Sequence, residues 1–243
     1  MPTKKETLYV VMPAYNEEAN IEEVVKSWYP ILKGKGEKSR LVIADSGSKD
    51  KTHQILIDLK KKYPKLEILA KTNQYHGPKC IALYKYAIKK KADWIFQTDS
   101  DGQTNPKEFP KFWAERNKYD AIIGKRLERG DGESRKNVEK VLCTLLKFYF
   151  KVTLPDANAP FRLMRTDLVL KHIGRLPDDY NLPNAMLTTY FVYFKEKVNF
   201  IPITFKPRQG GVNSINLKKI VGIGWDALKD FRTLSQALKS HSE

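Results

Sequence analysis

Residues 92–103 of this chain read ADWIFQTDSDGQ, an apolar run followed at once by an acidic turn. The run 92–96 is typical of a short buried strand. Asp99 and Asp101 lie one residue apart just past that strand, so they can point into one crevice and share a divalent cation. Ligands bind at this edge of an open α/β sheet, and Mg²⁺ and Mn²⁺ prefer oxygen ligands. Taken alone, the segment also fits a plain acidic turn, because Asp, Ser and Gly favour turns.

The first half of the chain alternates patterns typical of strands with patterns typical of helices. The expected strands are Leu8–Met12, Leu41–Ala44, Leu66–Ala70, Trp94–Phe96 and Ala121–Ile123. The expected helices are Glu17–Leu32, a helix through Ile55, Leu56 and Leu59, and a helix containing Ile81–Ile88. Strands that alternate with helices form βαβ units with right-handed crossovers. The pattern therefore predicts an α/β protein with a parallel sheet.

The second half of the chain changes in character from about residue 133. The expected elements are an amphipathic helix over Val138–Val152, a loop entering a short strand over Asp156–Met164, a strand over Val198–Phe205 and an amphipathic stretch over Leu217–Leu238. No repeat or low-complexity linker divides the chain, so one domain over residues 1–243 is expected. The two amphipathic stretches carry aromatic and basic residues, which suit a lipid surface. Their alternative is packing against the domain or a second subunit.

The composition describes a globular protein with an excess of positive charge. The chain has 243 residues, 41% of them hydrophobic, and Lys and Arg outnumber Asp and Glu by 44 to 28, a formal charge of +16. Such a charge suits nucleic acid, anionic lipid headgroups or a phosphorylated substrate. Nucleic acid is disfavoured as a partner, because no recognition motif or clustered basic helix is present. Cys80 and Cys143 lack metal or redox spacing and are expected to be structural thiols.

The sequence has neither the pattern of a signal peptide at its start nor a run long enough to span a membrane. The start, Met1–Thr7, is polar and leads straight into a strand, unlike a signal peptide. No apolar run approaches the roughly 18–20 residues that cross a bilayer. The chain is therefore expected to be soluble or peripheral to a membrane.

Two further turns are expected at the same edge of the sheet as the acidic turn, because the carboxyl ends of parallel strands meet there. The turn Pro13–Glu18 offers backbone N–H groups for a diphosphate and the Tyr15 ring for a nucleobase. The turn Asp45–Asp50 offers Asp45 as an acceptor for a base. The structural alternatives are Asn16 as an N-cap, Glu18 as a first-turn acid, and Ser48 or Asp50 as a helix cap. The convergence of the three turns favours a nucleotide-diphosphate site. The sequence has no glycine-rich dinucleotide fingerprint and no P-loop, which disfavours a Rossmann dehydrogenase or an NTPase.

Three ordered motifs resemble glycosyltransferase family 2. They are VVMPAYNEE at 10–18, DSGSKDKT at 45–52 and TDSDGQ at 98–103. More narrowly, the chain resembles the dolichyl-phosphate mannosyltransferase-like enzymes, which load sugars onto polyprenyl phosphates. The supporting motifs are Tyr75–Pro78 with Ala82 and Leu83, Gly124–Arg126, Asp156 with Pro160–Arg162, and Arg208 with Gly211 and Ser214. The resemblance covers roughly residues 8–230, and the ordered set is specific.

The resemblance implies a GT-A-type, Rossmann-like and mostly parallel sheet, an inverting reaction, a nucleotide-diphosphate sugar donor and Mg²⁺ or Mn²⁺. Residues from about 8 to 130 would form the donor half, and from about 131 to 243 the acceptor and membrane-facing half. The implied metal and diphosphate ligands are Asp99, Asp101 and Gln103. The implied nucleoside contacts are Pro13, Tyr15, Glu17 and Asp45. The implied phosphate contacts are Arg126, Arg208 and Arg135, the last with a surface role as its alternative.

The acceptor decides whether the implied reaction needs a general base. A polyprenyl phosphate is already ionised near neutrality, with a second pKa of about 6, so it would need positioning more than deprotonation. The catalytic residues that the resemblance implies are then Asp101, Arg126 and Arg208. A saccharide hydroxyl, the alternative acceptor, needs a base. Asp156 is the candidate base, with an N-cap or loop-bracing role as its alternative. The implied location is peripheral, at the cytoplasmic face of a membrane, and a homo-oligomer is compatible with the sequence.

Two departures from the family pattern concern substrate contacts. Ser46 stands where the family usually has a second Asp, which predicts altered contacts to the nucleobase. Ala159 and Pro160 stand where it tends to have Ser-Gly, so Asn158 becomes the candidate polar group of the acceptor loop.

Overall fold

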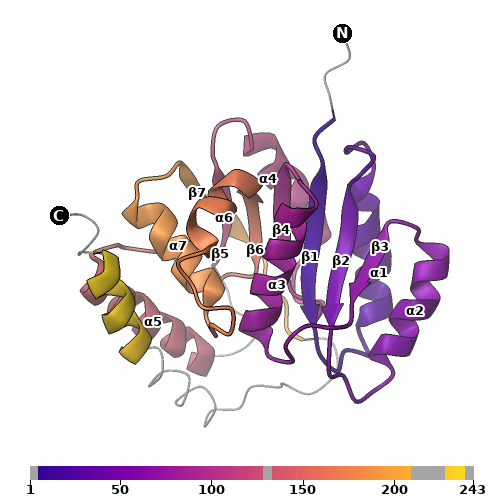
Figure 1. Cartoon of the computed structure of the whole chain (residues 1–243), viewed down its shortest axis with the longest axis horizontal. Helices are drawn as coiled ribbons and strands as arrows, with labels where there is room; N and C mark the ends of the chain where they lie inside the picture. Colours follow the sequence, from indigo (N-terminus) through magenta and orange to yellow (C-terminus); the bar gives the residue numbers. More distant parts are fainter. Residues whose placement is uncertain (1–4, 128–132, 209–227, 239–243) are drawn as a thin grey trace.

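A seven-stranded sheet forms the centre of the protein (Figure 1). The computed structural model describes residues 5–127, 133–208 and 228–238. The strands are β1 Leu8–Ala14, β2 Arg40–Asp45, β3 Leu66–Leu69, β4 Trp94–Thr98, β5 Ala121–Arg126, β6 Phe161–Arg165 and β7 Val198–Ile203. Their order is β3-β2-β1-β4-β6-β5-β7, and among these described strands only β6 is antiparallel to its neighbours. The predicted α/β class with a mostly parallel sheet is confirmed.

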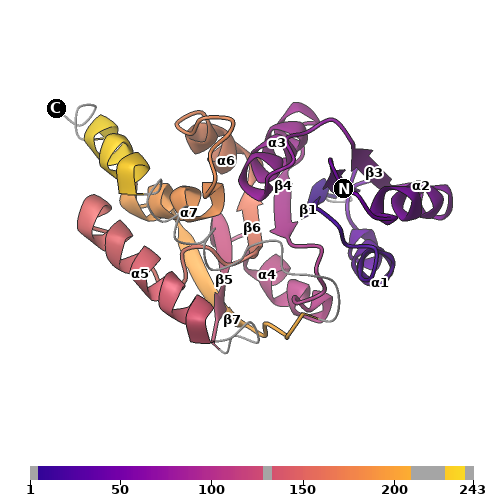
Figure 2. The same ribbon diagram turned by 90° about the horizontal axis from the view of Figure 1, so that it is seen from below.

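Helices cover both faces of the sheet (Figure 2). One face carries α1 (Ile21–Trp28), α2 (Thr52–Lys62) and α4 (Phe109–Glu115). The other carries α3 (His76–Lys89), α6 (Thr166–Ile173) and α7 (Pro183–Tyr193). Helix α5 (Glu133–Phe150) lies beside the helix 228–238, where Tyr149 and Phe150 contact Phe231. The sheet therefore separates two hydrophobic cores.

The central strands are buried on both faces. All seven residues of β1 and all five of β4 are buried, as expected for parallel strands covered by helices on each side. Val10 and Met12 contribute to one core, while Tyr9 and Val11 contribute to the other. Strand β4 therefore delivers the acidic turn from a rigid, fully packed element.

The first expected helix is shorter than the sequence suggested. Helical spacing predicted Glu17–Leu32, but α1 covers Ile21–Trp28 and a 3-10 turn, η1, follows over Tyr29–Leu32. Pro30 has no backbone N–H and clashes with a preceding turn, which explains why the α-helix stops there. The glycine-containing segment Tyr75–Pro78 also differs, because α3 begins inside it at His76 rather than after it.

Three helices were not expected from the sequence: α4, α6 and α7. Helix α7 is buried at every position of Pro183–Phe191, so it has no polar face and no helical period to detect. Of the amphipathic stretch Leu217–Leu238, the part 228–238 is helical and 217–227 lies outside the described residues. In the described parts of the chain, none of the helices combines the length and hydropathy that crossing a membrane requires.

Gly77 marks a close approach between α3 and the segment before α7. A Cβ atom at Gly77 would lie 2.4 Å from the carbonyl oxygens of both Tyr180 and Asn181. Gly77→Ala is therefore expected to lower the free energy of unfolding by about 1–3 kcal/mol, since backbone atoms must move. Urea unfolding measures this, with Gly174→Ala as the matched control, because nothing lies within 4 Å of a Cβ there. Equal midpoints for the two variants would contradict the packing described.

Candidate active site

Three turns meet at the carboxyl edge of neighbouring strands β2, β1 and β4, at the lower edge of the sheet in Figure 1. Ser100 Oγ of the acidic turn donates to the Pro13 carbonyl of the first turn (2.8 Å). The Lys49 N–H of the second turn donates to Asn16 Oδ1 of the first (2.8 Å). The predicted convergence of the three turns is confirmed, and hydrogen bonds fix their relative positions.

The backbone N–H groups of the first turn point into the second turn. Asn16, with φ of 54°, donates its N–H to Ser48 Oγ (3.0 Å), and Glu17 donates to Thr52 Oγ1 (2.8 Å). The first helix starts only at Ile21, with Asn20 as its N-cap residue. The alternative that Asn16 is the helix cap is therefore wrong. These N–H groups hold the two turns together instead of standing open for a diphosphate.

The acid pair follows β4 directly. Asp99 Oδ1 accepts from Gln97 Nε2 (3.1 Å) and lies 3.1 Å from His76 Nε2. Asp101 Oδ1 accepts from the Gln103 N–H (3.1 Å). Burial, and then the neighbouring charge of Asp99, raise the pKa of Asp101 to about 6. The turn thus holds two carboxylates that repel each other, an arrangement that a divalent cation would stabilise.

Gln103 ties the acidic turn to the chain beyond β7. Its Nε2 donates to the Lys206 carbonyl (2.8 Å), and the Lys206 N–H donates back to the Gln103 carbonyl (2.9 Å). Thr104 and Phe205 form a β-bridge next to this pair. The amide oxygen of Gln103 is the side-chain atom that can coordinate a cation. Within the described residues no three His, Cys, Asp or Glu side chains form a cluster able to hold a metal.

Arg208 lies two residues beyond Lys206, the residue that Gln103 holds, and pairs with Glu17 of the first turn. Arg208 Nη2 lies 2.6 Å from Glu17 Oε1, which joins residues 191 positions apart in the sequence. The charge of Arg208 also lowers the pKa of Asp101, against the effect of burial. Glu17 is 6% exposed, and burial raises its pKa to about 7, although Asn20 and Arg208 oppose the rise. The structure therefore places Glu17 against Arg208.

Two of the predicted nucleoside residues, Tyr15 and Asp45, lie near a lysine that the sequence did not single out. The Asp45 carboxylate accepts from Ser48 Oγ and lies 3.0 Å from His53 Nδ1. Lys79 is buried, donates to the Ala14 carbonyl (2.5 Å) and sits 5.3 Å from the Tyr15 ring centroid. Burial lowers the pKa of Lys79 to about 8, while Asp45 opposes that change. In the sequence Lys79 resembles any lysine of a helix. Its position two residues after Gly77 is the one signal that could have identified it as a site residue.

Arg126 and Asp156 form a buried ion pair at the end of β5. Arg126 Nε and Nη2 each lie 2.8 Å from an Asp156 oxygen, a bidentate arrangement. Glu139 of α5 lies 3.3 Å from Arg126 Nη2 and accepts from the Ala157 N–H (2.8 Å). This geometry favours the loop-bracing alternative for Asp156. The side chain of Arg135, and residues Gly211 and Ser214, lie outside what the structure describes.

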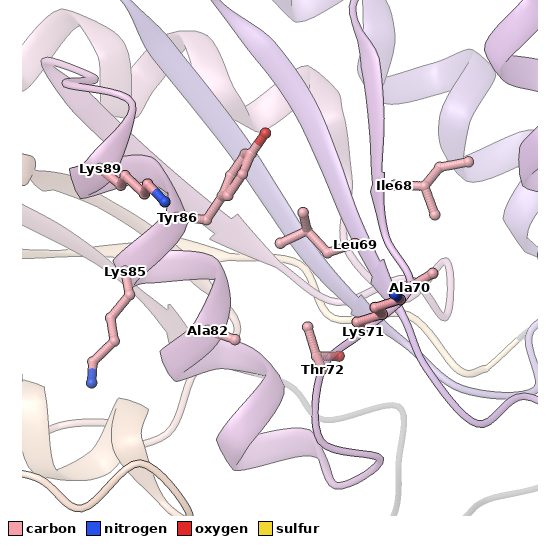
Figure 3. Close-up of a pocket in the computed structure, with 9 residues that line it drawn as sticks. All are labelled: Ile68, Leu69, Ala70, Lys71, Thr72, Ala82, Lys85, Tyr86 and Lys89. Carbon is pink, nitrogen blue, oxygen red and sulfur yellow. The ribbon is translucent and has the colours of Figure 1, made fainter.

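A groove of about 440 Å³ lies on another part of the surface, between α3 and the end of β3 (Figure 3). Its lining residues are Ile68, Leu69, Ala70, Lys71, Thr72, Ala82, Lys85, Tyr86 and Lys89. None of the predicted site residues lines it. The groove and the candidate active site are therefore separate features.

Comparison with known families gives the class of protein to which the chain belongs. Residues 9–173 match the profile of Glycosyl transferase family 2. The chain therefore belongs to glycosyltransferase family 2 and is a glycosyltransferase. The motifs at 10–18, 45–52 and 98–103 fall inside the matched region.

Two curated relatives carry the same name, undecaprenyl-phosphate 4-deoxy-4-formamido-L-arabinose transferase. The protein of Edwardsiella ictaluri is 21% identical over 218 residues, 89% of this chain and 65% of the relative. That of Photorhabdus laumondii is 23% identical over 233 residues, 95% of this chain and 70% of the relative. The chain thus spans about two thirds of the length of these relatives. Their names fit the predicted resemblance to polyprenyl-phosphate glycosyltransferases.

Solved structures share the fold at low sequence identity. Glucosyl-3-phosphoglycerate synthase from Mycobacterium tuberculosis, in complex with Mn²⁺, UDP-glucose and phosphoglyceric acid, superposes with a TM-score of 0.71. It is 18% identical, and the match covers 95% of this chain and 80% of the other. A second structure of that enzyme, with phosphoglyceric acid alone, gives a TM-score of 0.70. The expected GT-A-type fold is confirmed.

Proposed function

We propose that the protein transfers a sugar, with inversion, from a nucleotide-diphosphate donor to a polyprenyl phosphate at a membrane surface. In this reaction an acceptor phosphate oxygen attacks the anomeric carbon. The bond from that carbon to the donor diphosphate breaks, and the nucleoside diphosphate leaves with the bonding electrons. The observation that carries the proposal is the acid pair at the carboxyl edge of the sheet, where Arg208, paired with Glu17, lies close enough for its charge to act on Asp101.

The acid pair suits a divalent cation, Mg²⁺ or Mn²⁺. Asp99 and Asp101 would supply hard oxygen ligands, and burial followed by the charge of Asp99 raises the pKa of Asp101. Gln103 would add its amide oxygen, and donor phosphates would complete the coordination. Such a cation, when bound, would neutralise the charge that builds on the departing diphosphate. Mn²⁺ in the Mycobacterium tuberculosis complexes supports the same cofactor here.

The donor would lie across the first and second turns. Tyr15 offers a ring for the nucleobase, with Pro13 and Asp45 beside it at the same edge. Arg208 would contact the diphosphate, because its guanidinium acts electrostatically on Asp101 and suits a phosphate. Glu17 would then position Arg208 rather than contact the nucleoside directly.

An acceptor that needs no general base, such as an ionised phosphate, agrees with the pairing of Asp156 with Arg126. Asp156 is the candidate base for a hydroxyl acceptor, but it is buried and both of its oxygens accept from Arg126. A phosphate acceptor needs no base, since it is ionised near neutrality. The relatives named as undecaprenyl-phosphate transferases support this acceptor class. Arg126 would then order the acceptor loop through Asp156.

Helix α5 offers a surface for the lipid. Val138, Val141 and Phe148 are exposed on it, Phe148 to 66%, at helical spacing. Lys151 Nζ lies 5.3 Å from the Phe148 ring centroid, next to exposed Lys147. An apolar stripe edged by lysines suits a bilayer with anionic headgroups. This stripe supports peripheral binding, and we place it at the cytoplasmic face only because the family resemblance implies that location. A second copy of the chain is the alternative occupant of the stripe.

A donor screen tests the first half of the proposal. Uridine and guanosine diphosphate sugars are added to the full chain with and without Mn²⁺, and the midpoint of thermal unfolding is recorded. One nucleotide class is expected to raise the midpoint only when Mn²⁺ is present, because a ligand of the folded state stabilises it. The proposal would be contradicted if no nucleotide sugar changed the midpoint, or if Mn²⁺ made no difference.

A further inference from the structure

Two polar side chains lie side by side on the face of the sheet that α3 and α7 cover, close to the strand end that carries the acid pair. Gln97 of β4 and Arg162 of β6 are register partners, and both are fully buried. Their neighbours on the same face, Ile95 and Met164, are apolar and belong to the core under α3 and α7. Burying a polar group costs free energy unless it is hydrogen-bonded. A polar pair in this place therefore needs specific partners.

Gln97 belongs to a linear chain of hydrogen bonds that ends at Asp99. Tyr84 Oη of α3 donates to Asn184 Oδ1 of α7 (2.5 Å). Asn184 Nδ2 donates to Gln97 Oε1 (2.9 Å), and Gln97 Nε2 donates to Asp99 Oδ1 (3.1 Å). We name Tyr84, Asn184 and Gln97 the amide relay. Each of the three is at most 2% exposed, so water does not compete for these bonds.

Chemistry fixes the direction of the relay. A carboxylate only accepts, so Gln97 must present its NH₂ group to Asp99. Its oxygen is then left for the Asn184 NH₂ group, and the Asn184 oxygen is left for the Tyr84 hydroxyl. Reversing any one amide would place two acceptors or two donors face to face.

Arg162, the register partner of Gln97, also places its buried charge near Tyr84, the first donor of the relay. Arg162 Nη2 donates to Thr188 Oγ1, while Nε and Nη1 have no hydrogen-bond partner among the described residues. The Arg162 charge opposes the rise that burial causes in the pKa of Tyr84. A cation beside Tyr84 and an anion at Asp99 polarise the chain of bonds in the same direction, which strengthens each of them.

We propose that the amide relay is a set of positioning residues that holds the Asp99 carboxylate in one orientation for cation binding. The proposal rests on the proposed function, in which Asp99 and Asp101 hold the metal. Gln97 and His76 both meet Oδ1 of Asp99, which leaves Oδ2 as the oxygen to offer a cation. Outer partners of this kind orient metal ligands in many proteins. The relay thereby makes the affinity of the acid pair depend on α7, an element remote in sequence.

Mn²⁺ binding to the metal-free full chain, followed by electron paramagnetic resonance, tests the relay without any turnover. Asn184→Asp keeps the shape but cannot donate to Gln97, so Gln97 turns its oxygen toward Asp99. The Kd for Mn²⁺ is expected to rise about 10- to 100-fold. Tyr84→Phe removes only the first donor and is expected to raise Kd about 2- to 10-fold.

Thr189→Val is the matched control. Thr189 is buried on the same helix, but its hydroxyl donates to the Ala185 carbonyl, outside the relay. Its Kd should equal that of the wild type. If Asn184→Asp does not fold, Tyr84→Phe against Thr189→Val decides the question. Wild-type affinity in the folded relay variants would overturn the relay while leaving the metal role intact. A wild-type chain that binds no Mn²⁺, with or without UDP, would instead contradict the metal role, and the relay with it.

Discussion

Asp101→Asn is expected to lower metal-dependent sugar transfer by about 10²–10⁴-fold, because a bound cation contributes several kcal/mol to the transition state. An amide oxygen carries no charge and binds a divalent cation far less well than a carboxylate. The fold should remain intact. Burial and the repulsion from Asp99 raise the pKa of Asp101, so its ionised form destabilises the folded state above about pH 6. Removing that charge should leave the unfolding midpoint at pH 8 unchanged or higher.

The matched control for this variant is Asp58→Asn. Asp58 lies on the exposed side of α2, where it pairs only with Lys61 and Gln54 in the described structure. It should retain wild-type transfer and wild-type Mn²⁺ affinity. Normal turnover in folded Asp101→Asn would contradict the metal assignment.

Arg208→Ala is expected to lower transfer by about 10²–10³-fold, the size typical of losing one group that stabilises developing charge. It should also change how stability depends on pH. Burial already raises the folded-state pKa of Glu17 to about 7 from 4.5, and Arg208 opposes that rise. A raised pKa gives stability that is present at low pH and lost as pH rises through the folded value. Without Arg208 the pKa of Glu17 rises further, so the loss of stability extends above pH 7.

The double variant Glu17→Gln with Arg208→Ala separates the two roles of Arg208. Thermal midpoints in EDTA between pH 5 and 9 should show the added loss in Arg208→Ala and its recovery in the double variant. Transfer should stay low in both, because the diphosphate contact is still missing. Recovery of transfer in the double variant would show that Arg208 serves only to neutralise Glu17.

The edge of the sheet could be predicted from the sequence because its signals are local. Apolar runs ended by Pro13, Asp45 and Asp99 predict strands with turns at one edge, and β1, β2 and β4 are indeed neighbours. The candidate metal ligands of the acidic turn lie within five residues of one another. The three-turn arrangement therefore needed no tertiary knowledge beyond the rule that parallel strands end together.

The contacts that hold the site residues in place could not be predicted from the sequence, because they join segments that are distant along the chain. Asn184 lies on α7, a helix that is buried all round and so lacks a period. Glu17 and Arg208 pair across 191 positions of sequence, and Gln103 holds Lys206, two residues before Arg208. Asp156 is a plausible base by position, yet the fold gives both of its oxygens to Arg126. Such pairings are set by packing, and neither residue of a pair reveals its partner.

Product analysis tests the central claim most directly. The full chain is incubated with the nucleotide sugar that stabilises it, undecaprenyl phosphate and Mn²⁺, and the lipid fraction is examined by mass spectrometry. We predict a polyprenyl phosphate that carries one sugar, formed only with the cation and absent with Asp101→Asn. Donor consumption with the polyprenyl phosphate unchanged, and the sugar found free or on a saccharide, would contradict transfer to a lipid phosphate.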